Sequence, residues 1–117
     1  MKYKKPSKAN VARLRKLVVD FVLAHGGAWD RSGDEALGLV MLTKLGVLHV
    51  TPLDDWIACR WENVEKAREH FNVHYICVHR LNPYSGKWNF GCDVFGTPED
   101  VFEEWKRAVV PLLEGTQ

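Results

Sequence analysis

The C-terminal end of the chain carries the strongest local signal in the sequence and does most to constrain the fold. Thr97 can cap a helix with its hydroxyl, Pro98 suits the first helical position, and Asp100 completes a pattern that resembles a capping box. The apolar residues at helical spacing are Val101, Phe102, Trp105, Ala108, Val109, Leu112 and Leu113. Because this stripe lies on one face, the helix must pack against another apolar layer. Pro111 removes one helical hydrogen bond, which predicts a kink or an end near Val110.

Two further helices are predicted upstream. The first follows Ser7, whose hydroxyl can accept a free backbone N–H, and it ends at Gly26, which tolerates a left-handed conformation. Its apolar stripe consists of Val11, Leu14, Leu17, Val18, Phe21 and Val22. A shorter helix is predicted over Glu62–Phe71, with Asn72 as the left-handed residue that ends it.

The residues between these two helices favour three β-strands. Leu37–Thr43 and Val47–Thr51 flank a short connection that contains a glycine, which is typical of a β-hairpin. Trp56–Trp61 follows after a turn, and its side chains alternate between two faces. One face holds Ile57, Cys59 and Trp61, and the other holds Trp56, Ala58 and Arg60. In the strand before it, Leu48 and Val50 are predicted to face the core.

Two more β-rich runs are Val73–Leu81 and Lys87–Phe95. The segment Asn82–Asn89 between them is predicted to be a hairpin, because Pro83 presets the first corner of a turn and Gly86 can return the chain.

These elements predict an α+β fold in the order α-β-β-β-α-β-β-α. Its mainly antiparallel sheet has about five strands, a helix at each end of the chain and a short central helix. A chain of 117 residues falls within the usual size of one domain. We therefore expect residues 1–6 to be a basic, mobile arm and residues 7–117 to form a single domain.

Composition favours a soluble protein of the cytoplasm. No apolar stretch approaches the roughly 20 residues that span a bilayer, and no signal peptide is recognisable, so no membrane contact is expected. Cys59, Cys77 and Cys92 form an odd and widely spaced set, which indicates reduced thiols instead of a disulfide scaffold.

The positive charge is concentrated at one end of the chain. Residues 1–16 hold seven Lys or Arg and no acid, whereas the other 101 residues hold nine basic and fifteen acidic side chains. Basic side chains can contact phosphates without reading sequence, so this region is the candidate for nucleic-acid binding. Its candidate residues are Lys2, Lys4, Lys5, Lys8, Arg13, Arg15 and Lys16.

Signatures of catalysis or of a metal are weak. His70 and His74 have helical spacing, but Asn72 is expected to break the helix between them, and no Cys-x-x-Cys or His-Glu-x-x-His motif occurs. Ser85 lies in a turn without the Gly-x-Ser-x-Gly pattern of a nucleophile elbow. We assign no catalytic residue, metal or cofactor, and an enzyme with a site assembled only in the fold is the third alternative.

A protein-binding surface is the first hypothesis for function. The segment after Leu81 has more aromatic and polar residues than a turn needs, and an exposed Trp beside an Arg is typical of protein interfaces. The candidate contact residues are Trp56, Arg60, Asn82, Tyr84, Ser85, Lys87 and Asn89. The sequence thus predicts a small non-catalytic module that docks on a protein, such as an accessory or inhibitor protein of the phage or plasmid type. Nucleic-acid binding through the basic arm is the second alternative.

Overall fold

The structure is a computed structural model that describes residues 7–30, 38–72, 78–83, 89–90 and 93–113. Its elements in chain order are α1 (Lys8–Ala24), β1 (Ala28–Trp29), β2 (Leu39–Thr43), β3 (Gly46–Pro52), β4 (Ile57–Trp61), α2 (Val64–Phe71), β5 (Val78–Pro83), β6 (Asn89–Phe90), β7 (Asp93–Gly96), α3 (Pro98–Val109) and the 3-10 turn η2 (Val110–Leu112). The strands form one sheet in the order β1-β2-β3-β4-β5-β7-β6.

The predicted α+β class is confirmed. The five strands of four or more residues and the three helices follow the predicted order, and the two-residue strands β1 and β6 extend the sheet at its edges. Neighbouring strands are antiparallel except for β5 and β7, which pair in parallel.

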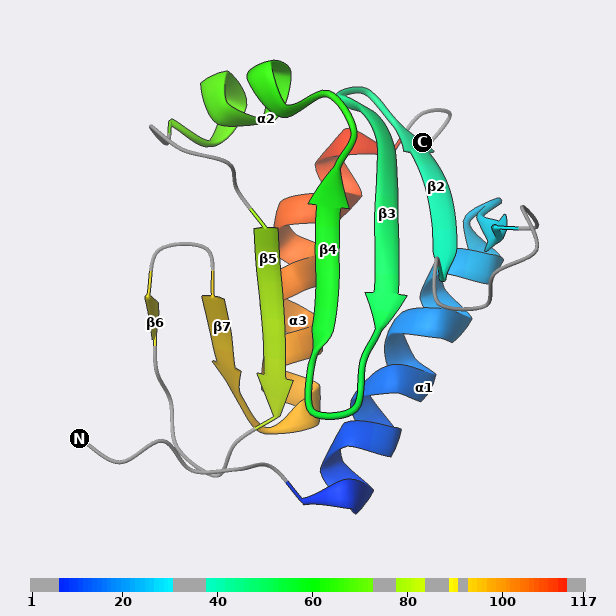
Figure 1. Cartoon of the computed structure of the whole chain (residues 1–117), viewed down its shortest axis with the longest axis vertical. Helices are drawn as coiled ribbons and strands as arrows, with labels where there is room; N and C mark the ends of the chain where they lie inside the picture. Colours follow the sequence, from blue (N-terminus) through cyan, green and yellow to red (C-terminus); the bar gives the residue numbers. More distant parts are fainter. Residues whose placement is uncertain (1–6, 31–37, 73–77, 84–88, 91–92, 114–117) are drawn as a thin grey trace.

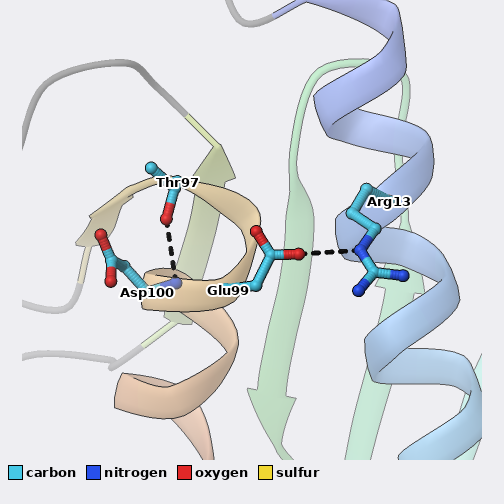
Figure 2. A network of polar contacts seen from close by, with 4 residues as sticks. All are labelled: Arg13, Thr97, Glu99 and Asp100. Atoms are coloured by element: carbon cyan, nitrogen blue, oxygen red, sulfur yellow. Dashed lines mark hydrogen bonds and ion pairs between the residues drawn. The ribbon is translucent and has the colours of Figure 1, made fainter.

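The predicted caps of α1 and α3 are also confirmed, whereas α2 begins at Val64, two residues after the predicted start at Glu62. The Ser7 hydroxyl accepts the Asn10 N–H at 3.1 Å, and the Thr97 hydroxyl accepts the Asp100 N–H at 3.2 Å (Figure 2). These bonds satisfy backbone donors that have no partner within the helix. At the other end, α3 gives way to the 3-10 turn that contains Pro111.

The predicted hairpin at Asn82–Asn89 is wrong. Residues 84–88 lie outside the described part of the chain, but the strands on either side of them are not neighbours. β5 pairs in parallel with β7, and β6 lies beyond β7 as its antiparallel partner. The run read as one strand over Lys87–Phe95 is therefore two short strands, and the second one inserts between β5 and the first.

The helices α1 and α3 cover one face of the sheet, and they lie behind it in Figure 1. The apolar stripe of each helix packs on the apolar rows of the strands, and together they form the core. Its fully buried members include Leu14, Val18, Val22, Leu39, Leu48, Val50, Ile57, Trp61, Leu81, Val101, Trp105 and Val109. The short helix α2 lies at one end of the sheet (Figure 1). None of the described helices combines the length and the apolar character that crossing a membrane requires.

Candidate protein-binding surface

The strand registers place two rows of side chains on the sheet face that α1 and α3 leave uncovered. Val40, His49 and Arg60 are paired across β2, β3 and β4, and the row below it consists of Thr51, Ala58 and Arg80. Paired residues of neighbouring strands point to the same side of a sheet, so each row is a continuous strip. We call these residues, together with Val47 and Trp56, the open-face patch.

The Trp56 ring and the Arg80 guanidinium lie in contact within this patch. The Arg80 Cζ atom lies 5.6 Å from the centroid of the Trp56 ring, within the range of a cation–π interaction. Trp56 is half-buried and Arg80 is exposed, so the indole presents an ordered apolar surface beside a charge. Trp and Arg are the residues that most often dominate the binding energy of protein interfaces.

Helix α1 holds the turn that precedes Trp56. The Leu53 N–H donates to the Trp56 carbonyl at 2.9 Å, which closes the turn between β3 and β4. The Leu53 carbonyl in turn accepts a bond of 2.9 Å from the Arg15 guanidinium. This charge-assisted hydrogen bond links α1 to the turn that precedes Trp56.

The neighbouring row of the patch holds Arg60 beside His49, and Arg80 is paired in register with Asp93 of β7. Arg60 is exposed, and among the described residues nothing forms an ion pair or hydrogen bond with its guanidinium. His49 Nε2 lies 3.5 Å from the Glu62 carboxylate, a contact that is an ion pair only when the imidazole is protonated.

The structure places the other predicted contact residues differently. Asn82 is buried, with 4% of its surface exposed, and its amide donates a long bond of 3.5 Å to the Arg80 carbonyl. It is thus not available on the surface. Asn89 belongs to the edge strand β6, and Tyr84, Ser85 and Lys87 lie outside the described residues.

Most of the described nucleic-acid candidates have partners within the molecule. Arg13 forms an ion pair of 2.8 Å with Glu99 at the start of α3 (Figure 2), and its hydrogen bond lowers the pKa of that carboxyl. Lys16 lies 3.2 Å from Asp20, and Arg15 holds the Leu53 carbonyl. Lys8 is exposed, and Lys2, Lys4 and Lys5 lie outside the described residues. Phosphate binding by these residues remains a prediction.

The described residues offer little for catalysis. Burial raises the pKa of the Cys59 thiol far above its ordinary value, so this sulfur stays protonated and shielded from solvent. No three His, Cys, Asp or Glu side chains gather to hold a metal ion within the described ranges. Cys77 and Cys92 lie outside them.

Arg80 is a charged member of the patch that the sequence analysis did not list among the candidates. The run Val73–Leu81 has apolar and polar residues on both of its faces, so its orientation could not be read from alternation. Pairing with β4 decides the orientation, because it sets Arg80 opposite Ala58 and His79 opposite Cys59. Compared with known proteins, the chain matches no protein family, no curated protein and no solved structure.

Proposed function

We propose that this chain is a non-catalytic binding module that docks a protein partner on the open-face patch. The observation that carries the proposal is that the Trp56–Arg80 stack and the exposed Arg60 share one sheet face, which the helices leave uncovered. An ordered aromatic side chain loses little conformational entropy on binding, and Arg can form several directed bonds to a partner. Both properties favour a protein interface.

The surroundings of these residues support the same function. Val40 and Val47 are partly exposed in adjoining strands, and Leu42 has 61% of its surface exposed. An aromatic and cationic centre beside apolar side chains matches the composition of many interface cores. Nucleic-acid binding has less support, because the Arg13, Arg15 and Lys16 charges are engaged within the molecule.

We further propose an accessory role, such as inhibition of a larger complex, and a cytoplasmic location. The free thiol of Cys59 suits a reducing compartment.

Affinity capture from a lysate of the native host, with and without nuclease, tests the proposal. The wild-type chain is compared with Trp56→Ala, Arg60→Glu and the control Arg107→Glu, which changes an α3 side chain that is 79% exposed. Capture should survive nuclease and the control substitution, and it should be lost with the two patch variants. Once the partner is identified, calorimetry should show that each patch substitution weakens binding about tenfold or more.

Two results would contradict the proposal. Equal capture by the wild type and both patch variants would place the interface elsewhere. Capture that disappears with nuclease would favour the basic arm and a nucleic-acid ligand. Circular dichroism of each variant verifies that a loss of capture is not a loss of fold.

A further inference from the structure

A shallow groove, largely open to solvent, lies at the end of the sheet next to the start of α2. Its volume is about 550 Å³, and its lining comes from the β2–β3 hairpin and from the link between β4 and α2. The lining residues are Leu42, Gly46, Val47, Glu62, Asn63, Val64 and Glu65. The aliphatic side chains of Leu42, Val47 and Val64 make it partly apolar, and two carboxylates belong to the same lining.

The groove is suited to a cation. The Glu62 and Glu65 side chains are 63% and 83% exposed. Glu65 pairs with Arg68 at 3.2 Å, whereas the contact of Glu62 with His49 is an ion pair only when the histidine is protonated. The groove therefore keeps negative charge beside aliphatic surface. Lysine matches this combination, because its apolar stem can pack while its ammonium reaches the carboxylates.

An anion is disfavoured at the same place. The Asn63 side chain already accepts the Lys66 N–H at the start of α2, so one of the free donors of this helix end is satisfied. Glu65 adds a negative charge in the first turn of the helix. Both features oppose the binding of phosphate or of a partner's carboxylate.

The chain contains a segment with the complementary chemistry. Residues 1–6 read Met-Lys-Tyr-Lys-Lys-Pro, with three lysines, no acid and two large apolar side chains. The beginning of α1 and the groove beside α2 lie at opposite ends of the long axis of the molecule, which measures 38 Å (Figure 1). Seven fully extended residues reach about 25 Å, so the arm is too short to run this length on its own molecule.

We propose that the basic arm of one copy, residues 1–6, binds the groove of a second copy. Two copies related by a twofold axis perpendicular to the long axis bring each arm beside the groove of the other, and the two contacts are then equivalent. The carboxylates are exposed, so the association is weak and is screened by salt. The groove shares Val47 with the open-face patch, but this inference does not rest on the proposed function, which is tested at Trp56 and Arg60.

The experiment measures association of the full chain by sedimentation equilibrium over a range of protein and salt concentrations. One variant reverses the arm charges (Lys2→Glu, Lys4→Glu, Lys5→Glu), and another reverses the groove charges (Glu62→Lys, Glu65→Lys). The control, Glu103→Lys with Glu104→Lys, makes the same charge change on α3, where the two carboxylates are 62% and 52% exposed.

Wild type and control should form dimers that weaken about tenfold or more between low and high salt, because the pairs are exposed to solvent. Each charge-reversed variant alone should be monomeric, and an equimolar mixture of the two should regain both complementary contacts and associate. A wild-type chain that is monomeric at every concentration overturns the proposal. Dimers that persist in both variants also overturn it, because they would use another interface. Partner capture through Trp56 and Arg60 is scored separately, so either proposal can fail without the other.

Discussion

At the scale of single residues, His79 is an ionisable side chain that the fold places among aromatic rings. Its ring centroid lies 5.2 Å from that of Phe71 and 6.4 Å from that of Trp61, in edge-on contacts. Burial lowers the pKa of His79, because the charged imidazolium loses hydration there. The unfolded chain, with a histidine pKa of about 6.5, then binds the proton more readily than the folded protein. The free energy of unfolding should therefore fall as the pH drops below that value and level off below the folded pKa.

Replacing His79 by glutamine removes the titrating imidazole, so this group no longer contributes to the pH dependence of the free energy of unfolding. Between pH 8 and pH 5 the wild type should lose more stability than His79→Gln, by at most about 1.4 kcal/mol per pH unit. Urea unfolding at a series of pH values measures both curves, and the carboxylates common to both proteins cancel in the difference. Parallel curves would mean that His79 is as hydrated in the folded protein as in the unfolded chain.

At the scale of elements, the start of α3 combines a cap with an ion pair (Figure 2). The Arg13 and Glu99 side chains are 52% and 58% exposed, so solvent screens their attraction and the pair adds little stability. The Thr97 hydroxyl instead satisfies a backbone donor that has no partner in the helix. Thr97→Ala should lower the free energy of unfolding by about 1 kcal/mol, and Thr97→Ser should retain most of it.

Urea unfolding at neutral pH measures this difference. The comparison of alanine with serine isolates the hydroxyl, because both replacements remove the threonine methyl group. Equal losses in the two variants would show that the methyl group, and not the cap, stabilises this end of the helix.

At the scale of the whole molecule, local patterns in the sequence were sufficient for part of the fold. Helix ends follow from caps, prolines and glycines near each other in the chain, and the faces of β3 and β4 follow from strict alternation. The order of β5, β6 and β7 depends instead on strand pairing, which is determined by contacts between residues far apart in the sequence, including the packing of β5 and β7 on α3. Turn chemistry at Pro83 and Gly86 carried no information about that choice. Trp56 and Arg60 could be predicted as surface residues from the alternation of side chains along β4. The side on which Arg80 lies could be decided only from the pairing of β5 with β4.

The two-layer architecture predicts opposite responses from adjacent residues of one strand. Cys59 has none of its surface exposed and lies between Val50 and His79 in the core, whereas Arg60 points to the open face. Cys59→Ser buries a hydroxyl in apolar surroundings and should lower the free energy of unfolding by about 1–3 kcal/mol. Arg60→Ser should change it by no more than about 0.5 kcal/mol.

Urea unfolding of the two serine variants is a matched measurement, because the replacement residue and the strand are the same. Similar losses in both would mean that the outer face contributes to folding as the core does. A loss confined to Cys59→Ser would show that Arg60 is not needed for stability. Any effect of an Arg60 substitution on partner capture can then be assigned to the contact itself.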